Sequence, residues 1–327
     1  MWSFDIGHSI NAMRRTLPFI VVRLIVYFGV ALLYVIATGV GGGIGYGFTS
    51  FGDGQGAGAF YGAMFGFAGA SGFLYWAREY ILYLVKTGHI AVLVHHHDGK
   101  KLPEGRGQID YAITEVKSRF AQASMLFALD QLIKGVLKVI TGVLNTVASF
   151  LPVPGLDNLV KMINAVLKIS LTYVDEIILA YIIRTDTDNP WEISRRGLIL
   201  YAQNYGTMVK NAIWLAIFMW LTTFVIFLIL IGPVVGLMAL FPGDFGFWSF
   251  IVAFIFAWSF KAALLEPLAI YALMQVYFAT IEGQEPDQVW DDRLSEASDK
   301  FRELKDKAVS AFRSTSGKSD QPARPAA

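Results

Sequence analysis

Four long apolar stretches constrain this chain more than any other feature. They cover residues 18–40, 57–77, 213–240 and 247–281. A membrane-spanning helix needs about 20 predominantly apolar residues, and each stretch meets that length. Composition agrees, because 55% of the residues are hydrophobic and only 16% are charged, whereas soluble domains carry about 25% charged residues. The sequence therefore predicts membrane helices.

Two further stretches, 120–151 and 159–183, are long enough to span a membrane but contain lysines. A cluster of prolines and a glycine between them predicts a tight turn. Together the six stretches predict an all-α, polytopic membrane helical bundle of about six transmembrane helices. The pair over 120–183 has an alternative interpretation, as a hairpin that lies at the membrane interface.

Lysine and arginine are distributed asymmetrically between the connections. The connections at 40–56, 151–155 and 242–244 contain neither residue, whereas the 78–119 loop, the 184–210 loop and both termini are basic. Basic loops favour the cytoplasmic side, so the pattern predicts that both termini are cytoplasmic (N-in/C-in). We expect a multi-pass protein of the plasma membrane, of the bacterial inner-membrane type, with the lipid bilayer as its first partner.

The chain divides into four predicted segments. Residues 1–17 form an amphipathic helix along the inner surface, and 18–285 form the transmembrane bundle. Residues 286–313 form a cytoplasmic amphipathic helix that docks on its own bundle or pairs with a partner, and the Ser/Pro/Ala-rich tail 314–327 is disordered. The heptad-like apolar positions of the cytoplasmic helix are Trp290, Leu294, Ala297, Phe301, Leu304, Ala308 and Ala311.

Small residues recur every four positions in the second apolar stretch. Such a ladder lines one helix face and lets another backbone approach closely. It packs the first two helices together, serves as a self-association face in a homo-oligomer, or lines a pore or moving helix. Glycines between 41 and 47 predict a flexible outer connection before it. The ladder comprises Gly54, Gly58, Gly62, Gly66 and Ala70.

A few charges fall at membrane depth in these predicted spans. Charged groups there are costly, pair with one another and often mark a substrate or ion path. If the third and fourth spans run antiparallel, Lys134 faces Asp175. The alternative is a structural seam in which every charge is satisfied. The candidate path residues are Glu266, Lys261, Asp175, Glu176, Lys134, Lys138 and Lys168.

Glu266 is the best single functional candidate. It lies near the centre of the last span, directly before Pro267, and proline has no N–H to donate, so a kink is expected there. A kinked helix that carries an intramembrane carboxylate can form an ion or proton site. A purely structural counter-ion is the alternative.

Other kinds of chemistry find little support. The chain has no cysteine, and it has no nucleophile–base, nucleotide-binding or zinc-protease motif, so an enzyme is disfavoured and no cofactor is expected. A net charge of +1 provides no field for nucleic acid. His95, His96 and His97 are weak metal candidates, because adjacent side chains seldom converge on one ion.

One segment resembles a known family. Tyr201-Ala202-Gln203-Asn204-Tyr205, followed by Lys210-Asn211-Ala212 entering an apolar stretch, is similar to a segment of the choline-transporter-like family. Val85-Lys86-Thr87-Gly88 and the entry over 112–137 are also similar, so the resemblance covers roughly residues 80–285. The chain lacks that family's large extracellular domain, and no ligand residue carries over. The resemblance implies a transporter-type bundle whose aromatic interior suits an organic cation.

Two functions follow as expectations. The first is a transporter or channel-like permease for a small solute of cationic type, with a path lined by the charged residues at membrane depth. The second is a non-catalytic membrane scaffold or assembly protein that oligomerises through the glycine ladder or the C-terminal helix.

Overall fold

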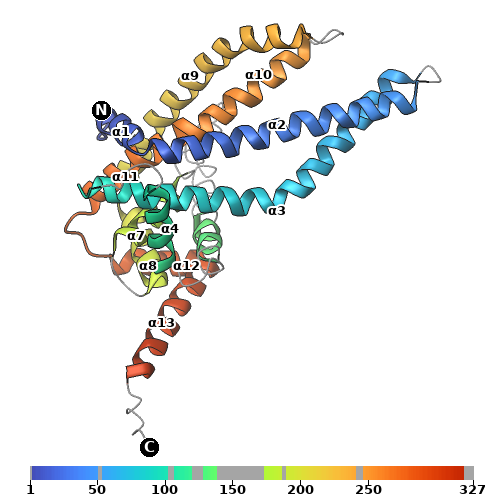
Figure 1. The fold of residues 1–327 in the computed structure, drawn as a ribbon. Coiled ribbons are helices and arrows are strands. Elements are labelled where there is room, and N and C mark those ends of the chain that lie inside the picture. The colour runs from blue at the N-terminus through green and yellow to red at the C-terminus, as the bar shows by residue number, and fades with distance from the viewer. Residues whose placement is uncertain are drawn as a thin grey trace, which may run out of the picture. The chain divides into compact units, whose positions relative to one another are not determined.

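The chain is all-α throughout the part that the computed structural model describes, namely residues 2–50, 54–101, 107–119, 128–137, 173–185, 189–240 and 246–319 (Figure 1). A short helix also covers residues 128–137. The labelled elements are α1 (Ile6–Arg15), α2 (Leu17–Phe48), α3 (Gln55–His97), α4 (Gly107–Arg119), α7 (Val174–Arg184), α8 (Pro190–Gln203), α9 (Tyr205–Met238), α10 (Gly246–Phe260), η1 (Lys261–Leu265), α11 (Glu266–Ile281), α12 (Gln288–Ala297) and α13 (Asp299–Ser319).

Two compact units make up the chain, and each is built from separate stretches of sequence. Unit 1 comprises Met1–Ala12, Ile90–Ile217 and Ala269–Ala327, and unit 2 comprises Met13–His89 and Phe218–Leu268. Several long helices contribute residues to both units. The units differ in the kind of surface that they present.

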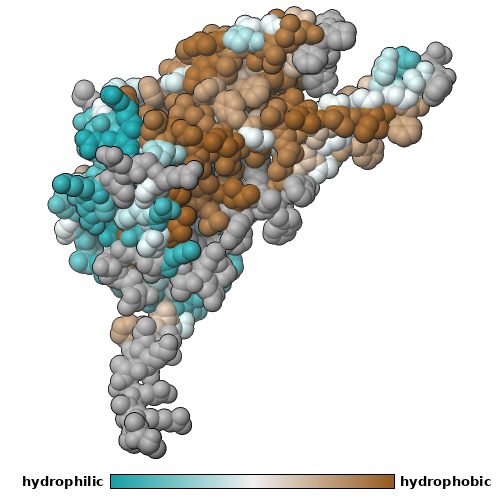
Figure 2. Space-filling model, in the orientation of Figure 1, coloured by the Kyte–Doolittle hydropathy of each residue, from teal (hydrophilic) through white to brown (hydrophobic). Residues whose placement is uncertain are grey.

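Unit 2 exposes large apolar side chains along its helices. Among the described residues, three helical segments are long and apolar enough to cross a membrane: Leu17–Phe48, Tyr205–Met238 and Ser249–Ile281. Figure 2 shows the apolar surface as the brown area over the long helices. So large an apolar surface is unfavourable in water and suits lipid, so these helices indicate a membrane protein. Prominent members are Ile25, Leu32, Ile36, Phe65, Leu221, Ile229, Phe250 and Phe254.

The glycines of α2 and α3 pack directly against one another. A Cβ on Gly45 would lie 2.0 Å from the carbonyl oxygen of Gly58, and one on Gly62 would lie 2.1 Å from that of Gly41. A Cβ on Gly66 would lie equally close, at 2.1 Å, to the Ala37 carbonyl oxygen. The ladder therefore brings two helices of the same chain into backbone contact. Gly54 and Ala70 differ from the other ladder members: Gly54 has only Thr49 nearby, at 3.9 Å, and Ala70 is a buried side chain.

The prediction of a flexible connection over residues 41–47 is wrong. Helix α2 continues through these glycines to Phe48. Glycine is a poor helix former in isolation, but Gly41 and Gly45 repeat the four-residue spacing of the ladder on the facing helix. Close packing against α3 stabilises the helical conformation of this segment.

Helix α8 lies at the centre of unit 1. It begins with Asn189, whose side chain accepts a hydrogen bond from the Glu192 N–H, and with Pro190 in its first turn, which is a favoured helix start. α7, α12 and α13 pack against α8. The predicted cytoplasmic helix 286–313 consists of two helices that Ser298 separates, and α13 extends to Ser319, into the tail predicted to be disordered. Its apolar positions Leu294, Phe301, Leu304 and Ala308 are buried.

A buried carboxylate links α8, α12 and α13. Asp291, only 1% exposed, accepts hydrogen bonds from Arg195 Nε at 2.9 Å and Lys305 Nζ at 2.7 Å. Burial by itself raises the pKa of Asp291, but the hydrogen bonds and charges of Arg195 and Lys305 outweigh it, so this pKa lies below its ordinary value. The three-way ion pair therefore joins three helices of unit 1.

Helix α7 is enclosed by protein and not exposed like the helices of unit 2. Eight of its residues are buried, among them Ile177, Ile178 and Ile182, and it contacts α8 and α4. Most of the 120–183 pair, including its Pro/Gly turn, lies outside the described residues, so six spans and the N-in/C-in orientation stay predictions.

Candidate functional site

The helix that ends unit 2 changes its winding at the candidate residue Glu266. Residues Lys261–Leu265 form a π-helical turn in which the Glu266 N–H donates to the Lys261 carbonyl, five residues back. In an α-helix the Glu266 N–H would donate to the Ala262 carbonyl, four residues back. In the π register the Ala262 carbonyl would instead accept from residue 267, which is a proline and has no N–H. The expected kink is therefore a π turn, which leaves the Ala262 carbonyl without a backbone partner.

Arg23 of α2 donates a hydrogen bond to the Ala262 carbonyl, which has no backbone partner in the π turn. Its Nη2 donates to Ala262 O at 3.0 Å, and its side chain is 1% exposed. A buried carbonyl needs a hydrogen-bond partner, and a guanidinium is a strong one. The sequence therefore couples Pro267 to Arg23 through a single backbone oxygen.

Three cationic side chains surround the Glu266 carboxylate. Lys261 Nζ lies 3.3 Å from Oε1, whereas Arg23 Nη2 and Lys86 Nζ lie 3.8 Å and 3.9 Å from Oε2. The π turn explains the Lys261 contact, since positions five apart on an α-helix point about 140° away from each other at 100° per residue. We call Arg23, Lys86, Lys261 and Glu266 the Glu266 cluster.

Aromatic rings border the Glu266 cluster. Lys261 Nζ lies 4.8 Å from the centroid of the Trp258 ring, and the Arg23 guanidinium lies 5.8 Å from that of Tyr27. Both distances are within the range of cation–π attraction. The rings offset part of the cost of removing these cations from water.

His89 of α3 lies beside this cluster as a neutral group. Its Nε2 is 3.0 Å from Thr16 Oγ1, and its ring stacks on Phe19 with centroids 5.3 Å apart. Burial lowers the pKa of His89 well below its ordinary value, and the charge of Arg23 lowers it further. His89 therefore adds no positive charge at neutral pH.

Three of the other predicted path residues, Lys134, Asp175 and Glu176, are described and lie in unit 1. Lys134 Nζ lies 2.7 Å from Asp130 Oδ2 and 3.7 Å from Asp175 Oδ2. The antiparallel register predicted the second of these contacts but not the first. Glu176 is buried beside Asp175, whereas Lys138 and Lys168 lie outside the described residues. Lys261 and Glu266 therefore belong to a separate cluster.

The three adjacent histidines point to different neighbours. His95 Nδ1 lies 2.8 Å from the Tyr111 hydroxyl, the His96 ring packs edge-on against His8, and the His97 ring packs against Phe278. Burial, followed by the charge of Arg184, lowers the pKa of His97. No group of three or more metal-ligating side chains occurs among the residues that the structure describes.

Two members of the Glu266 cluster escaped prediction from the sequence. Lys86 belonged to the basic 78–119 loop and to the Val85–Gly88 segment of the family resemblance but was not a path candidate, and Arg23 was not singled out. One signal identifies Arg23: it is the only charged residue in the apolar stretch 18–40. An isolated arginine in such a stretch needs a partner, which makes it a candidate in its own right.

The fold and the cluster define an all-α protein with membrane-type helices and a buried ionic site. Comparison with family models, with curated proteins and with solved structures found no match for the chain. The assignment of function therefore depends on the geometry of this chain.

Proposed function

We propose that this chain is a membrane permease for a small solute and that the Glu266 cluster is its polar site. One observation carries the proposal: an ionic cluster in an apolar unit lies at a π turn. Charged groups in such surroundings are expensive and usually functional, and π turns inside α-helices occur frequently at functional sites. A structural ion pair alone would need neither three cations nor an irregular helix.

A Glu266→Gln variant tests this proposal. Purified protein is reconstituted into vesicles, and uptake of radiolabelled choline and of radiolabelled inorganic phosphate is measured against protein-free vesicles. We expect wild-type protein to take up one probe and Glu266→Gln to lower that uptake roughly tenfold or more. Loss of the carboxylate leaves its three cationic neighbours uncompensated, which would exclude a cation or hold an anion too tightly for release, and a unit charge about 4 Å from another is worth several kcal/mol at intermediate dielectric.

The matched control is Glu282→Gln, which makes the same chemical change at an exposed position beyond α11. It should leave uptake unchanged. The proposal of a permease is contradicted if wild-type protein takes up neither probe. It is also contradicted if the Glu266→Gln variant and wild type show equal uptake.

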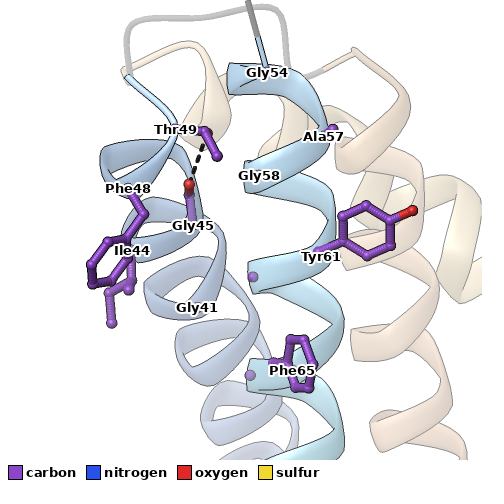
Figure 3. Close-up of a pocket in the computed structure, with 12 residues that line it drawn as sticks. Gly41, Ile44, Gly45, Phe48, Thr49, Gly54, Ala57, Gly58, Tyr61 and Phe65 are labelled. Atoms are coloured by element: carbon purple, nitrogen blue, oxygen red, sulfur yellow. Dashed lines mark hydrogen bonds between the residues drawn. The ribbon is translucent and has the colours of Figure 1, made fainter. Parts of the chain in front are cut away.

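A membrane scaffold is the second candidate, and an apolar groove favours it. The groove has a volume of about 620 Å³. It runs along the line where the glycines of α2 and α3 pack together, which we call the glycine seam (Figure 3). Ile44 and Phe48 project from α2, and Tyr61 and Phe65 project from α3. Most of the ladder packs against α2 within the chain, and four of the heptad positions are buried: Leu294, Phe301, Leu304 and Ala308. Self-association would therefore use this groove, and a Phe65→Ser variant should then reduce the oligomer mass measured by light scattering.

A further inference from the structure

We infer that the Glu266 cluster binds an anionic phosphate group. The inference rests on the proposed function only in that it assigns a ligand class to the same site. Three cationic side chains, Arg23, Lys86 and Lys261, converge on the single Glu266 carboxylate. Such a convergence of cations suits an anionic ligand, in contrast to the organic cation that the family resemblance implies.

Arg23 provides the second, independent observation. Its Nε and Nη1 are buried and donate to no acceptor in the described part of the chain. Only Nη2 is engaged, by Ala262 O. Buried guanidinium N–H groups without acceptors are unfavourable, and their planar, forked geometry matches the oxygens of a phosphate.

Lys86 is the cation of the cluster that a ligand can reach from outside. Its side chain is 27% exposed, against 11% for Lys261 and 1% for Arg23. A ligand would thus meet the flexible Lys86 ammonium first and the fixed Arg23 guanidinium last. Lysine contributes a mobile point charge, and arginine contributes directional hydrogen bonds.

The depth of the cluster corresponds to a phospholipid headgroup. Lys261 follows the 15 residues of α10, which span ~22 Å, and Arg23 is ~37 Å along α2 from Phe48. A hydrocarbon layer is about 30 Å thick, so a cluster at these distances from the far ends of α10 and α2 lies toward the near side of the layer, although Glu266 is central in the longer segment Ser249–Ile281. Phosphate at this depth comes from a lipid headgroup or from a soluble phosphate that enters from the adjoining water.

Binding in detergent distinguishes these sources. Native mass spectrometry of the full chain measures binding of phosphatidylglycerol and of phosphatidylcholine, and calorimetry measures binding of inorganic phosphate. We expect phosphatidylglycerol to bind at least about tenfold more tightly than phosphatidylcholine, a ratio that corresponds to 1.4 kcal/mol. A headgroup site shows this preference with little affinity for inorganic phosphate, whereas a soluble-phosphate site shows the reverse.

Two variants of opposite sign make the test specific. Lys86→Gln should weaken binding of the preferred phosphate ligand by about tenfold, because it removes one attracting charge. Glu266→Gln should tighten it, because it removes a repelling carboxylate. A structural role for Glu266 alone would lower stability and would not raise affinity. Lys86 is partly exposed, so its replacement should leave the protein folded.

The control for net charge is Lys100→Gln at an exposed position, which should change the affinity less than twofold. Equal weakening by Lys100→Gln and Lys86→Gln, or binding of choline but of no phosphate ligand, overturns the inference. Phosphate binding without solute uptake retains the inference and contradicts the permease, so the two proposals fail separately.

Discussion

Replacing Asp291 with asparagine should destabilise unit 1 by about 3 kcal/mol, because removing one member of a buried ion pair leaves the other charges uncompensated. Arg195 and Lys305 would both lose their hydrogen bonds to this carboxylate. Arg195 would keep Glu192, which also accepts from it, so the effect falls at the lower end of the usual range. Hydrogen exchange measured by mass spectrometry on the full chain should show faster exchange in α8, α12 and α13.

The effect of this variant should depend on pH in a defined direction. The folded state lowers the pKa of Asp291, so the ion pair contributes its full stability above the unfolded pKa of about 3.9. That contribution is lost as the pH falls through the lower folded pKa. The difference between wild type and Asp291→Asn should therefore be constant near neutral pH and shrink in acid below pH ~4.

Asp292→Asn is the matched control for this prediction. Asp292 is the next residue on α12, is exposed, and accepts a hydrogen bond only from Gln288 among the described contacts. Its replacement should change stability by less than about 0.5 kcal/mol. Equal exchange rates in wild type and Asp291→Asn would show that the ion pair does not hold the three helices together.

The second large effect is expected at the glycine seam. Gly45→Ala places a Cβ 2.0 Å from the Gly58 carbonyl oxygen. The Cβ is fixed to the backbone of α2 and the oxygen is part of the backbone of α3, so neither atom can move away alone. The helices must separate, which costs about 1–3 kcal/mol for overpacking of this kind. Adding Gly62→Ala, which meets the Gly41 carbonyl at 2.1 Å, should increase the loss.

Gly43→Ala is the control, because a Cβ at Gly43 meets nothing within 4 Å. Alanine is the better helix former, so this variant should be neutral or stabilising by up to about 1 kcal/mol. The thermal midpoint in detergent reports stability. Spin labels at Ile44→Cys and Tyr61→Cys, the only cysteines in the labelled chain, report the separation of α2 and α3. An unchanged distance in Gly45→Ala would contradict the seam.

Sequence patterns predicted the helical class and the main apolar helices because run length and hydropathy are local properties. Four of the seven heptad positions in the C-terminal region, Leu294, Phe301, Leu304 and Ala308, are buried as expected, whereas Ala297 is exposed and the break at Ser298 was not predicted. The glycines over 41–47 were misassigned because helix propensity is a local rule, and here contact with a second helix overrides it.

Partner identity within the Glu266 cluster was beyond local rules. Pro267 predicts a kink, but only the backbone shows that the kink is a π turn and that it brings Lys261 and Glu266 to one side. Arg23 and Ala262 are separated by 239 positions, and no periodicity in either helix connects them. The contact of Lys134 with Asp175 agrees with the antiparallel register that was predicted, and the contact with Asp130 is an i,i+4 pair on one helix that the spacing alone could have identified.

That long separation has a consequence for synthesis in the cell. Arg23 enters the membrane with the first apolar helix, but the carbonyl and the carboxylate that receive it are translated 239 or more residues later. At 5–20 residues per second, this delay is roughly 10 to 50 seconds. Until then the guanidinium lacks both the Ala262 carbonyl and the Glu266 carboxylate, so the buried contacts of Arg23 form only after the last long helix has been made.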